Sequence, residues 1–275
     1  MDQLDGGTLA VLAGLVGGAV LGLAARLGRF CMMGAVEDAV YGGDLTRMRM
    51  LALAAATAIG GTALLAAAGG FDPAATVYLR NGWSPLAAIA GGLLFGYGMA
   101  QVGTCGFGAL ARLGGGDLRS LVMVIVIGVA GAATLTGPLE GLRLALVPPV
   151  TLEAGQASLA ETVGRAAGVD RALPALLAAA ALAAVALADP GFRRAGRPFL
   201  WGVAAGGAIV FAWAVTSHAG RTGFDLVPVQ SFSFVAPLGE ALGALMHGSA
   251  AALPGFAIAS VAGAIHLRQP GKPRL

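Results

Sequence analysis

Long apolar runs alternate with short polar segments along most of this chain. A helix needs about 20 apolar residues to cross a bilayer, because each residue advances it by about 1.5 Å. Runs of about that length predict membrane-spanning helices, seven in all, at 8–27, 47–69, 84–101, 118–137, 172–188, 199–217 and 252–267. The pattern therefore predicts an all-α integral membrane protein, with residues 1–275 forming one membrane domain.

Three other segments, 28–46, 102–117 and 218–250, are rich in glycine and only partly apolar. They are too short or too interrupted to cross a membrane, yet too apolar for ordinary loops. Irregular backbone survives at membrane depth only when it is buried inside protein. We therefore expect short re-entrant or half-helical segments there, and an external connection with some amphipathic helix at 138–171.

Composition and charge agree with a bilayer as the chain's environment. Of 275 residues, 57% are hydrophobic and 11% are charged, against about 25% charged in soluble domains. The net charge of +3 comes from arginines in short loops such as 189–198 and from the C-terminal tail. Without a basic face interleaved with aromatic residues, no nucleic-acid partner is expected. The positive-inside rule predicts an inner-membrane protein with its N-terminus outside and its C-terminus in the cytoplasm.

The chain contains only two cysteines, Cys31 and Cys105, and they lie in nearly the same phrase. With the cysteines in register, the phrase is GG-x3-G-x8-C-x2-GA, followed by GGDL and a span. Such self-similarity predicts an internal repeat, with 1–69 as the first copy and 84–137 as the second. A fainter third copy near 206–226, within the C-terminal half 172–275, would enter from the opposite side. The Gly-x3-Gly pairs at 18/22 and 92/96 predict close helix packing.

Each cysteine follows a span and precedes a short helix, whose N-terminal N–H groups favour anions. A neutral thiol there would donate a weak hydrogen bond, whereas a thiolate would attack a sulfur–sulfur bond. We expect no catalytic residue, metal site or cofactor. For two further sets of candidate residues, a structural role explains the pattern as well as a functional role does. Arg29, Arg112 and Arg221 would attract an anion or only snorkel to the interface, and Ser231 and Ser233 would bind substrate or cap a helix.

The segments "GRFCMMGAVEDAV" (28–40) and "GYGMAQVGTCGFGALARLGGGDLRS" (96–120) resemble the two signature segments of the YeeE/YedE sulfur-transport family. The segment "SFSFVAPLGEAL" (231–242) is similar to a C-terminal stretch of shorter members. The resemblance implies an hourglass-like helical channel, with inverted pseudo-two-fold symmetry, that imports thiosulfate along cysteine thiols. It implies that Cys31 and Cys105 are motif cysteines and that the surrounding turns are Gly28, Gly34, Gly103, Gly106 and Gly108.

One departure from that family concerns a third cysteine, which better-known members carry in the C-terminal half and this chain lacks. Its place in a thiol relay would fall to Ser231, Ser233 or His218. The family also implies a small cytosolic sulfur-carrier protein as a partner. The alternative hypothesis is a membrane thiol–disulfide electron conduit similar to CcdA-type carriers. It requires Cys31 and Cys105 to form a disulfide, with Cα atoms within about 7 Å.

Overall fold

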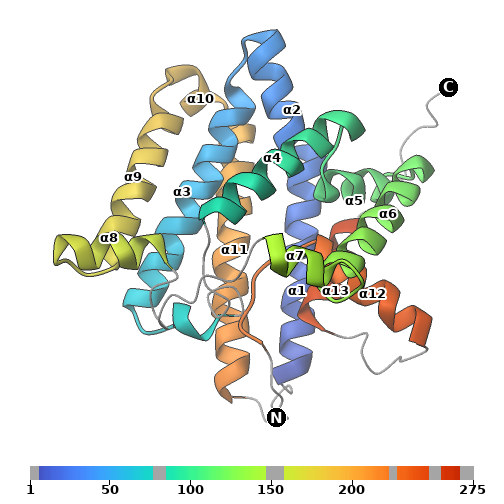
Figure 1. Cartoon of the computed structure of the whole chain (residues 1–275). Helices are drawn as coiled ribbons and strands as arrows, with labels where there is room; N and C mark the ends of the chain where they lie inside the picture. Colours follow the sequence, from blue (N-terminus) through green and yellow to red (C-terminus); the bar gives the residue numbers. More distant parts are fainter. Residues whose placement is uncertain (1–5, 77–84, 147–157, 223–227, 248–254, 267–275) are drawn as a thin grey trace, which may run out of the picture.

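The computed structural model describes residues 6–76, 85–146, 158–222, 228–247 and 255–266, and helices dominate these ranges (Figure 1). No β-strand forms among the described residues, where Thr76 and Val229 make an isolated bridge. The predicted all-α fold is therefore confirmed. The helices are α1 (Gly6–Leu27), α2 (Met32–Glu37), α3 (Thr46–Ala67), α4 (Pro85–Val102), α5 (Gly106–Gly114), α6 (Leu118–Leu135), α7 (Glu140–Leu146), α8 (Leu159–Ala167), α9 (Ala172–Leu187), α10 (Pro190–Arg194), α11 (Gly196–Thr222), α12 (Val235–His247) and α13 (Phe256–His266), with a π-helical turn η1 (Asp38–Gly42) and a 3-10 turn η2 (Pro73–Ala75).

Several of these helices are long and apolar enough to cross a membrane. Within the described ranges there are five such stretches, or six if α8 and α9, bent by 116°, count as one span. A multi-pass membrane fold is therefore confirmed, but the predicted total of seven spans is not. The seventh predicted span corresponds to α13, whose 11 residues extend only about 16 Å, roughly half of a hydrocarbon core of about 30 Å.

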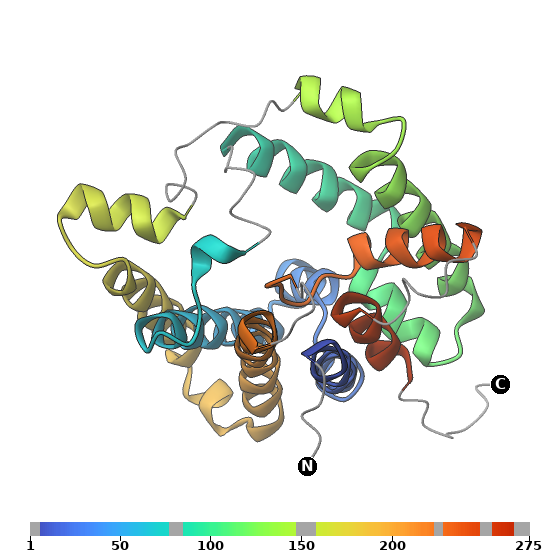
Figure 2. The same ribbon diagram turned by 90° about the horizontal axis from the view of Figure 1, so that it is seen from below.

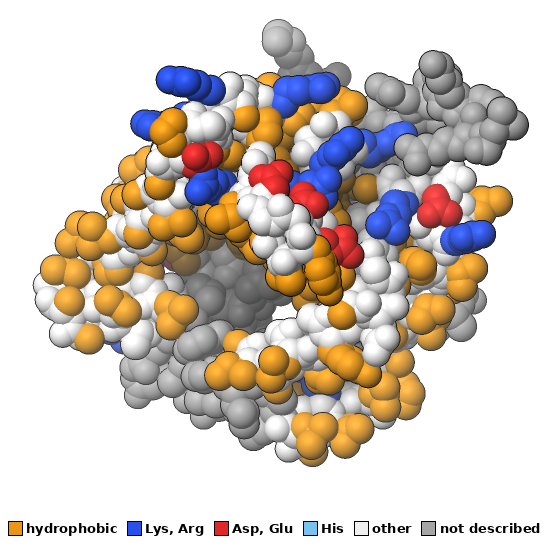
Figure 3. All heavy atoms as spheres, turned by 90° about the horizontal axis from the view of Figure 1, so that it is seen from above, with side chains coloured by type: hydrophobic (Ala, Val, Ile, Leu, Met, Phe, Trp, Pro, Cys, Tyr) orange, Lys and Arg blue, Asp and Glu red, His pale blue; other side chains and the backbone are white. Residues whose placement is uncertain are grey.

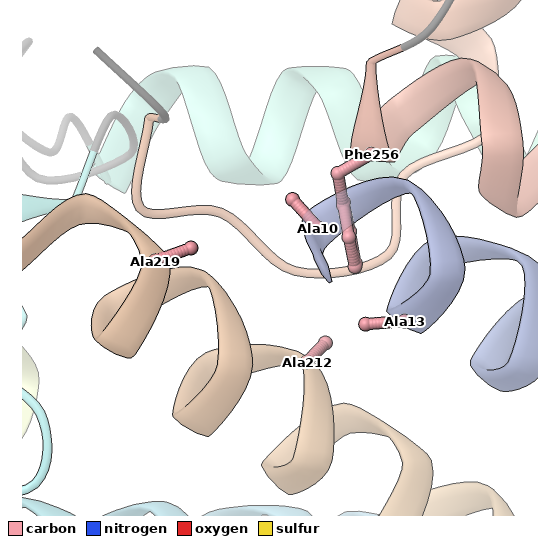
Figure 4. Packing of buried hydrophobic residues seen from close by; sticks show 5 residues of the cluster. All are labelled: Ala10, Ala13, Ala212, Ala219 and Phe256. Carbon is pink, nitrogen blue, oxygen red and sulfur yellow. The ribbon is translucent and has the colours of Figure 1, made fainter. Parts of the chain in front are cut away.

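The long helices α1, α3 and α11 run side by side through the middle of the molecule (Figure 1). Seen from below, α9 lies outside α3, and α13 lies against α1 (Figure 2). Small side chains form the centre of this packing, as they do where helices approach closely in membranes. Figure 4 shows one such cluster, in which Phe256 of α13 meets four alanines: Ala10 and Ala13 of α1, and Ala212 and Ala219 of α11.

Glycines on α1 allow the closest helix contact in the fold. A methyl group at Gly14 would lie 2.5 Å from the carbonyl oxygen of Phe256, and one at Gly22 would lie 2.6 Å from that of Ala264. Gly18, between them, faces the Ser260 carbonyl even more closely. The predicted packing role of the 18/22 pair is confirmed.

The corresponding glycines of α4 behave differently. A methyl group added at Gly92 or at Gly96 would have no described atom within 4 Å. Neighbouring apolar residues of α4 are exposed, including Leu93 at 71% and Leu94 at 73%. The predicted packing surface at 92/96 is therefore wrong for the described part of the chain, because no other described helix packs on this face of α4.

The third broken segment also begins later than expected. Helix α11 continues without interruption to Thr222, so the predicted end of that span at 217 is wrong. The reason is packing: Ala219 is fully buried against α1, and the Thr216 hydroxyl donates to the carbonyls of Ala212 and Gln230. Gly220, which takes the cysteine position when the faint third copy is aligned with the other two, therefore lies inside a continuous helix rather than at a break.

The predicted external connection 138–171 contains α7 and α8, the latter amphipathic as expected. Residues 147–157 between them lie outside the described residues, as do 223–226 of the faint third copy and the basic C-terminal tail.

Candidate functional site

Both cysteines lie where a long helix breaks before a short one. Cys31 separates α1 from α2 and has extended backbone angles, with φ −148° and ψ 126°. Cys105 separates α4 from α5 and is also extended, with φ −94° and ψ 170°. Each cysteine carbonyl accepts the N–H four residues later, from Ala35 at 3.0 Å and from Ala109 at 2.9 Å. The predicted breaks are confirmed, and each cysteine is the N-cap of the short helix that follows.

The two breaks use different residues to turn the chain. Before Cys105, Gly103 has φ +71°, a left-handed conformation that glycine adopts without a steric penalty. Before Cys31, the left-handed residue is Arg29, with φ +53°, which costs about 1–3 kcal/mol for a residue other than glycine. Gly28 has a packing role instead, because a methyl group there would lie 2.6 Å from both the Ala24 carbonyl oxygen and the Trp201 ring.

The fold brings the two thiols together from segments 74 residues apart. Both side chains are partly buried and unbridged, and they are close enough to interact with each other. The Cys105 Sγ atom also accepts the Gly108 N–H at 3.4 Å. The site therefore has two free thiols side by side.

The glycines three residues after each cysteine leave room beside the thiols. A methyl group at Gly108 would lie 3.6 Å from the Cys105 Sγ atom and 2.5 Å from the hydroxyl oxygen of buried Thr104. A methyl group at Gly34 would collide with the Arg47 guanidinium and lie 3.9 Å from the Cys31 Cβ atom. Gly106 differs, because a methyl group there would make only ordinary contacts, the nearest at 3.6 Å from Val235.

A cluster of phenylalanines adjoins the cysteines, and the sequence analysis missed it. Phe30 precedes Cys31, and Phe107 lies two residues after Cys105. Both belong to one hydrophobic cluster with Phe232 and Phe234 of the non-helical segment 228–234, and the Phe107 and Phe234 rings are 4.9 Å apart. All three predicted broken segments therefore meet at this site. The signal was the alternation in "SFSF" (231–234), where every second residue is a phenylalanine.

Comparison with known proteins assigns this arrangement to a family. A family model described as sulphur transport matches residues 27–266, which is most of the chain. The chain belongs to the sulphur transport family. The thiosulfate transporter TsuA of Escherichia coli (strain K12) is 28% identical to it over 136 residues. That alignment covers 50% of this chain and 37% of TsuA, so the chain matches about a third of that relative's length.

Membership of the sulphur transport family identifies a transport protein rather than an enzyme, and the resemblance to YeeE/YedE proteins is confirmed. The family model includes both cysteine segments and the phenylalanine-rich segment 228–234. Its boundaries at residues 27 and 266 coincide with the last residues of α1 and α13.

The three candidate arginines of this sulphur transport family member lie in different places. Arg112 is exposed at the end of α5, donates to the Gly103 carbonyl at 3.5 Å, and its charge acts on Cys31. Arg29, also exposed, directly follows Gly28 at the first break. Arg221 lies 20 residues along α11 from Trp201, which packs against Gly28, and is therefore about 30 Å away from this end. There it donates to the Gly69 carbonyl and the Ser217 hydroxyl, at 3.0 Å each.

The candidate serines and His218 are also separated. Ser231 is buried and donates to the Ile209 carbonyl at 3.4 Å, which fixes the segment to α11. Ser233 is partly buried between Phe232 and Phe234 in the chain, so it lies in the part of the segment that reaches the cysteines. His218 is exposed near the Arg221 end of α11.

Helix α13 connects the two helices that hold the cysteines. It packs along α1, which leads to Cys31, and also against α5, which follows Cys105. On α5, the backbone of Gly114 meets the Ile265 carbonyl too closely for any side chain to fit. Helix α13 therefore links the helix that precedes Cys31 to the helix that follows Cys105.

Arginines gather on the face of the molecule nearest α2, which Figure 3 shows from above. Two ion pairs hold this face together: Arg47 with Asp38 at 3.0 Å, and Arg49 with Asp189 at 2.6 Å. Arg193 and Arg194 of α10 are exposed. The end of the fold where the cysteine segments lie is therefore rich in arginine, with acidic side chains between the arginines.

Proposed function

We propose that this protein lets a small sulfur-containing anion, thiosulfate first, cross the inner membrane by passing between Cys31 and Cys105. The observation that carries the proposal is the pairing of two free thiols, from distant segments, at the N-caps of short helices. Support for the substrate comes from family membership and from the similarity to the thiosulfate transporter TsuA.

The proposed passage uses neutral thiols as hydrogen-bond donors. A thiolate would repel a dianion, and at 4 Å such a repulsion is worth about 4 kcal/mol per charge pair even at an effective dielectric of 20. A neutral S–H group instead donates a weak bond to the anion. The N-terminus of α5, with nine residues, adds N–H groups and a partial positive charge beside Cys105. When the anion enters, the two thiols donate to it instead of interacting with each other. When the thiols interact with each other again, the anion is released.

Other parts of the site restrict and guide this passage. The rings of Phe107 and Phe234 pack together beside the cysteine segments and offer no hydrogen bond to an anion, so the anion would depend on the cysteines and Ser233. Arg112 raises the local concentration of anions at the mouth of the site. By the positive-inside rule, the face rich in arginine is cytoplasmic and the N-terminus is outside. Import is the direction that the resemblance to YeeE/YedE proteins implies. A small cytosolic sulfur-carrier protein would receive the anion at this face.

We also propose that 1–69 and 84–137 are repeats that each supply one cysteine. The shared N-cap position of Cys31 and Cys105 supports this proposal. We extend this proposal to residues 172–275, which would form an inverted second half and give the channel an hourglass shape.

The test is uptake of radiolabelled thiosulfate into cells that lack their own sulfur importers. We expect uptake with the wild-type protein, none with Cys31→Ala or Cys105→Ala, and partial uptake with Cys105→Ser, because a hydroxyl also donates a hydrogen bond. Equal amounts of protein in the membrane fraction are the control. Wild-type uptake that neither alanine variant reduces would contradict the thiol mechanism. If the wild type imports nothing while a Cys31–Cys105 disulfide accumulates in cells, the electron conduit is the better account.

A further inference from the structure

A cavity of about 900 Å³ lies between the lower halves of α3, α9 and α11, away from the cysteines (Figure 1). Its volume is near the upper end of the range of about 300–1,000 Å³ for ligand pockets. The walls are mainly apolar and include Ile59, Phe71, Leu176, Ile209 and Trp213. None of the residues proposed for anion passage lines it, so the cavity requires a different occupant.

The depth of the cavity matches one leaflet of a bilayer. Its lining on α3 extends from Ala58 to Ala67, nine residue steps or about 14 Å, which is close to half of a hydrocarbon core of about 30 Å. These residues form the C-terminal half of a helix that spans the membrane. The apolar walls therefore extend from the middle of the bilayer to one surface, the space that an acyl chain occupies.

The charged residues that line the cavity lie on α8 or just before α9. Helix α8 is bent by 116° from α9, so it runs along the membrane surface when α9 crosses the membrane. Two of its apolar residues, Leu159 and Val163, are 61% and 52% exposed, as in a helix that rests on lipid. Ser158 and Glu161 line the cavity where α8 begins. The polar rim is therefore at the depth of lipid headgroups.

The charges on this rim have both signs. Arg171 lines the cavity, is exposed, and forms no ion pair among the described residues. Asp170 lies beside it, with one carboxylate oxygen accepting the Ala172 N–H at 2.7 Å. Glu161 pairs with Arg165 at 2.8 Å. A headgroup with a phosphate near Arg171 and an amine near the carboxylates would match this rim, whereas a headgroup with only negative charge would meet Asp170 and Glu161.

We propose that the cavity holds one phospholipid with a zwitterionic, amine-bearing headgroup. Its acyl chain lies between α3, α9 and α11, and its headgroup lies between Arg171 and α8. The bound lipid fills a space that the described side chains leave open, and it fastens α8 to α3. This site is independent of the anion passage.

Native mass spectrometry of the detergent-purified full chain tests the proposal. Delipidated protein receives equal amounts of phosphatidylethanolamine, phosphatidylglycerol and diacylglycerol. We expect one retained lipid per chain, chiefly phosphatidylethanolamine. Ala66→Phe, which fills the cavity from α3, should reduce the retained fraction at least fivefold. Leu64→Phe is the matched control, because Leu64 lies on the same helix but is 60% exposed and does not line the cavity. Arg171→Gln should abolish the preference for phosphatidylethanolamine over diacylglycerol.

A second measurement does not depend on how well Ala66→Phe folds. Brominated phosphatidylethanolamine, added to the delipidated protein in detergent, should quench wild-type tryptophan fluorescence more strongly than that of Trp213→Phe. The proposal is overturned if no lipid remains bound to the wild type, or if Ala66→Phe retains as much lipid as Leu64→Phe. Retention that is equal for all three lipids, or equal quenching in both proteins, would also overturn it. Thiosulfate takes no part in these measurements, so the outcome is separate from that of the transport proposal.

Discussion

The contact between α1 and α13 yields a prediction that joins packing to function. Gly22→Ala places a methyl group 2.6 Å from the Ala264 carbonyl oxygen, whereas an ordinary contact begins at 3.4 Å. The two helices must therefore separate by about 0.8 Å at this point, because the obstacle is backbone and cannot rotate away. Overpacking of this kind costs about 1–3 kcal/mol.

Gly96→Ala is the matched control, since Gly96 aligns with Gly22 in the cysteine phrase but has no described atom within 4 Å. Alanine in an open helical position stabilises the helix by about 0.5–1 kcal/mol relative to glycine. One kcal/mol shifts the melting temperature of a chain of this size by about 2–4 °C. Gly22→Ala should therefore melt about 2–12 °C below the wild type, and Gly96→Ala should melt at or slightly above the wild-type temperature.

The assay is thermal melting in detergent, followed by fluorescence-detected gel filtration of all three proteins. Thiosulfate uptake per folded molecule should also fall in Gly22→Ala, because α13 contacts both α1 and α5, the helices that adjoin the two cysteines, and its displacement would disturb both. Equal melting temperatures for the two variants, or an unchanged one for Gly22→Ala, would refute this reasoning.

Three further predictions concern charge, the aromatic cluster and a helix cap. Arg112→Gln should lower thiosulfate uptake at low substrate concentration several-fold, while Arg221→Gln, at the other end of α11, should leave uptake per folded molecule unchanged. Phe234→Ala should remove the ring contact with α5 and lower the melting temperature, but by less than the drop of about 6–20 °C that a fully buried Phe→Ala change of about 3–5 kcal/mol would give, because Phe234 is only partly buried. Hydrogen bonds from the hydroxyl and N–H of Thr46 hold the pKa of Asp44 below its ordinary 3.8, so its stabilising effect persists above that pH and is lost as pH falls through the lowered pKa. Melting curves should show a constant difference between wild type and Asp44→Ala from pH 8 to 5, and a difference that shrinks as the pH falls below 3.8.

The sequence predicted the parts of the fold that depend on local pattern. Hydropathy located the long helices, because crossing a bilayer requires an uninterrupted apolar run. The glycines around Cys31 and Cys105 predicted both breaks, although only Gly103 turns the chain as expected, whereas Arg29 does so before Cys31. Both kinds of signal lie within about 20 neighbouring residues.

Features that depend on distant partners could not be read in the same way. Gly22 and Gly96 occupy equivalent positions in the sequence, yet only Gly22 faces a helix, because α13 comes from the far end of the chain. The end of α11 depends on Ala219 packing against α1, and the aromatic cluster depends on Phe234 reaching α5. Such contacts are properties of the folded arrangement rather than of the local pattern.

The central claim, that the anion passes between the two thiols, is tested most directly by protection from alkylation. Purified protein would be treated with N-ethylmaleimide, and the labelling of Cys31 and Cys105 would be followed by mass spectrometry with thiosulfate, with sulfate or with neither. Tyr41→Cys, at a position 89% exposed, provides a third thiol that reports any loss of reagent in solution. We predict that thiosulfate slows labelling of both native cysteines but not of residue 41, and that sulfate has a smaller effect. Equal labelling with and without thiosulfate, in protein that imports it, would contradict the account.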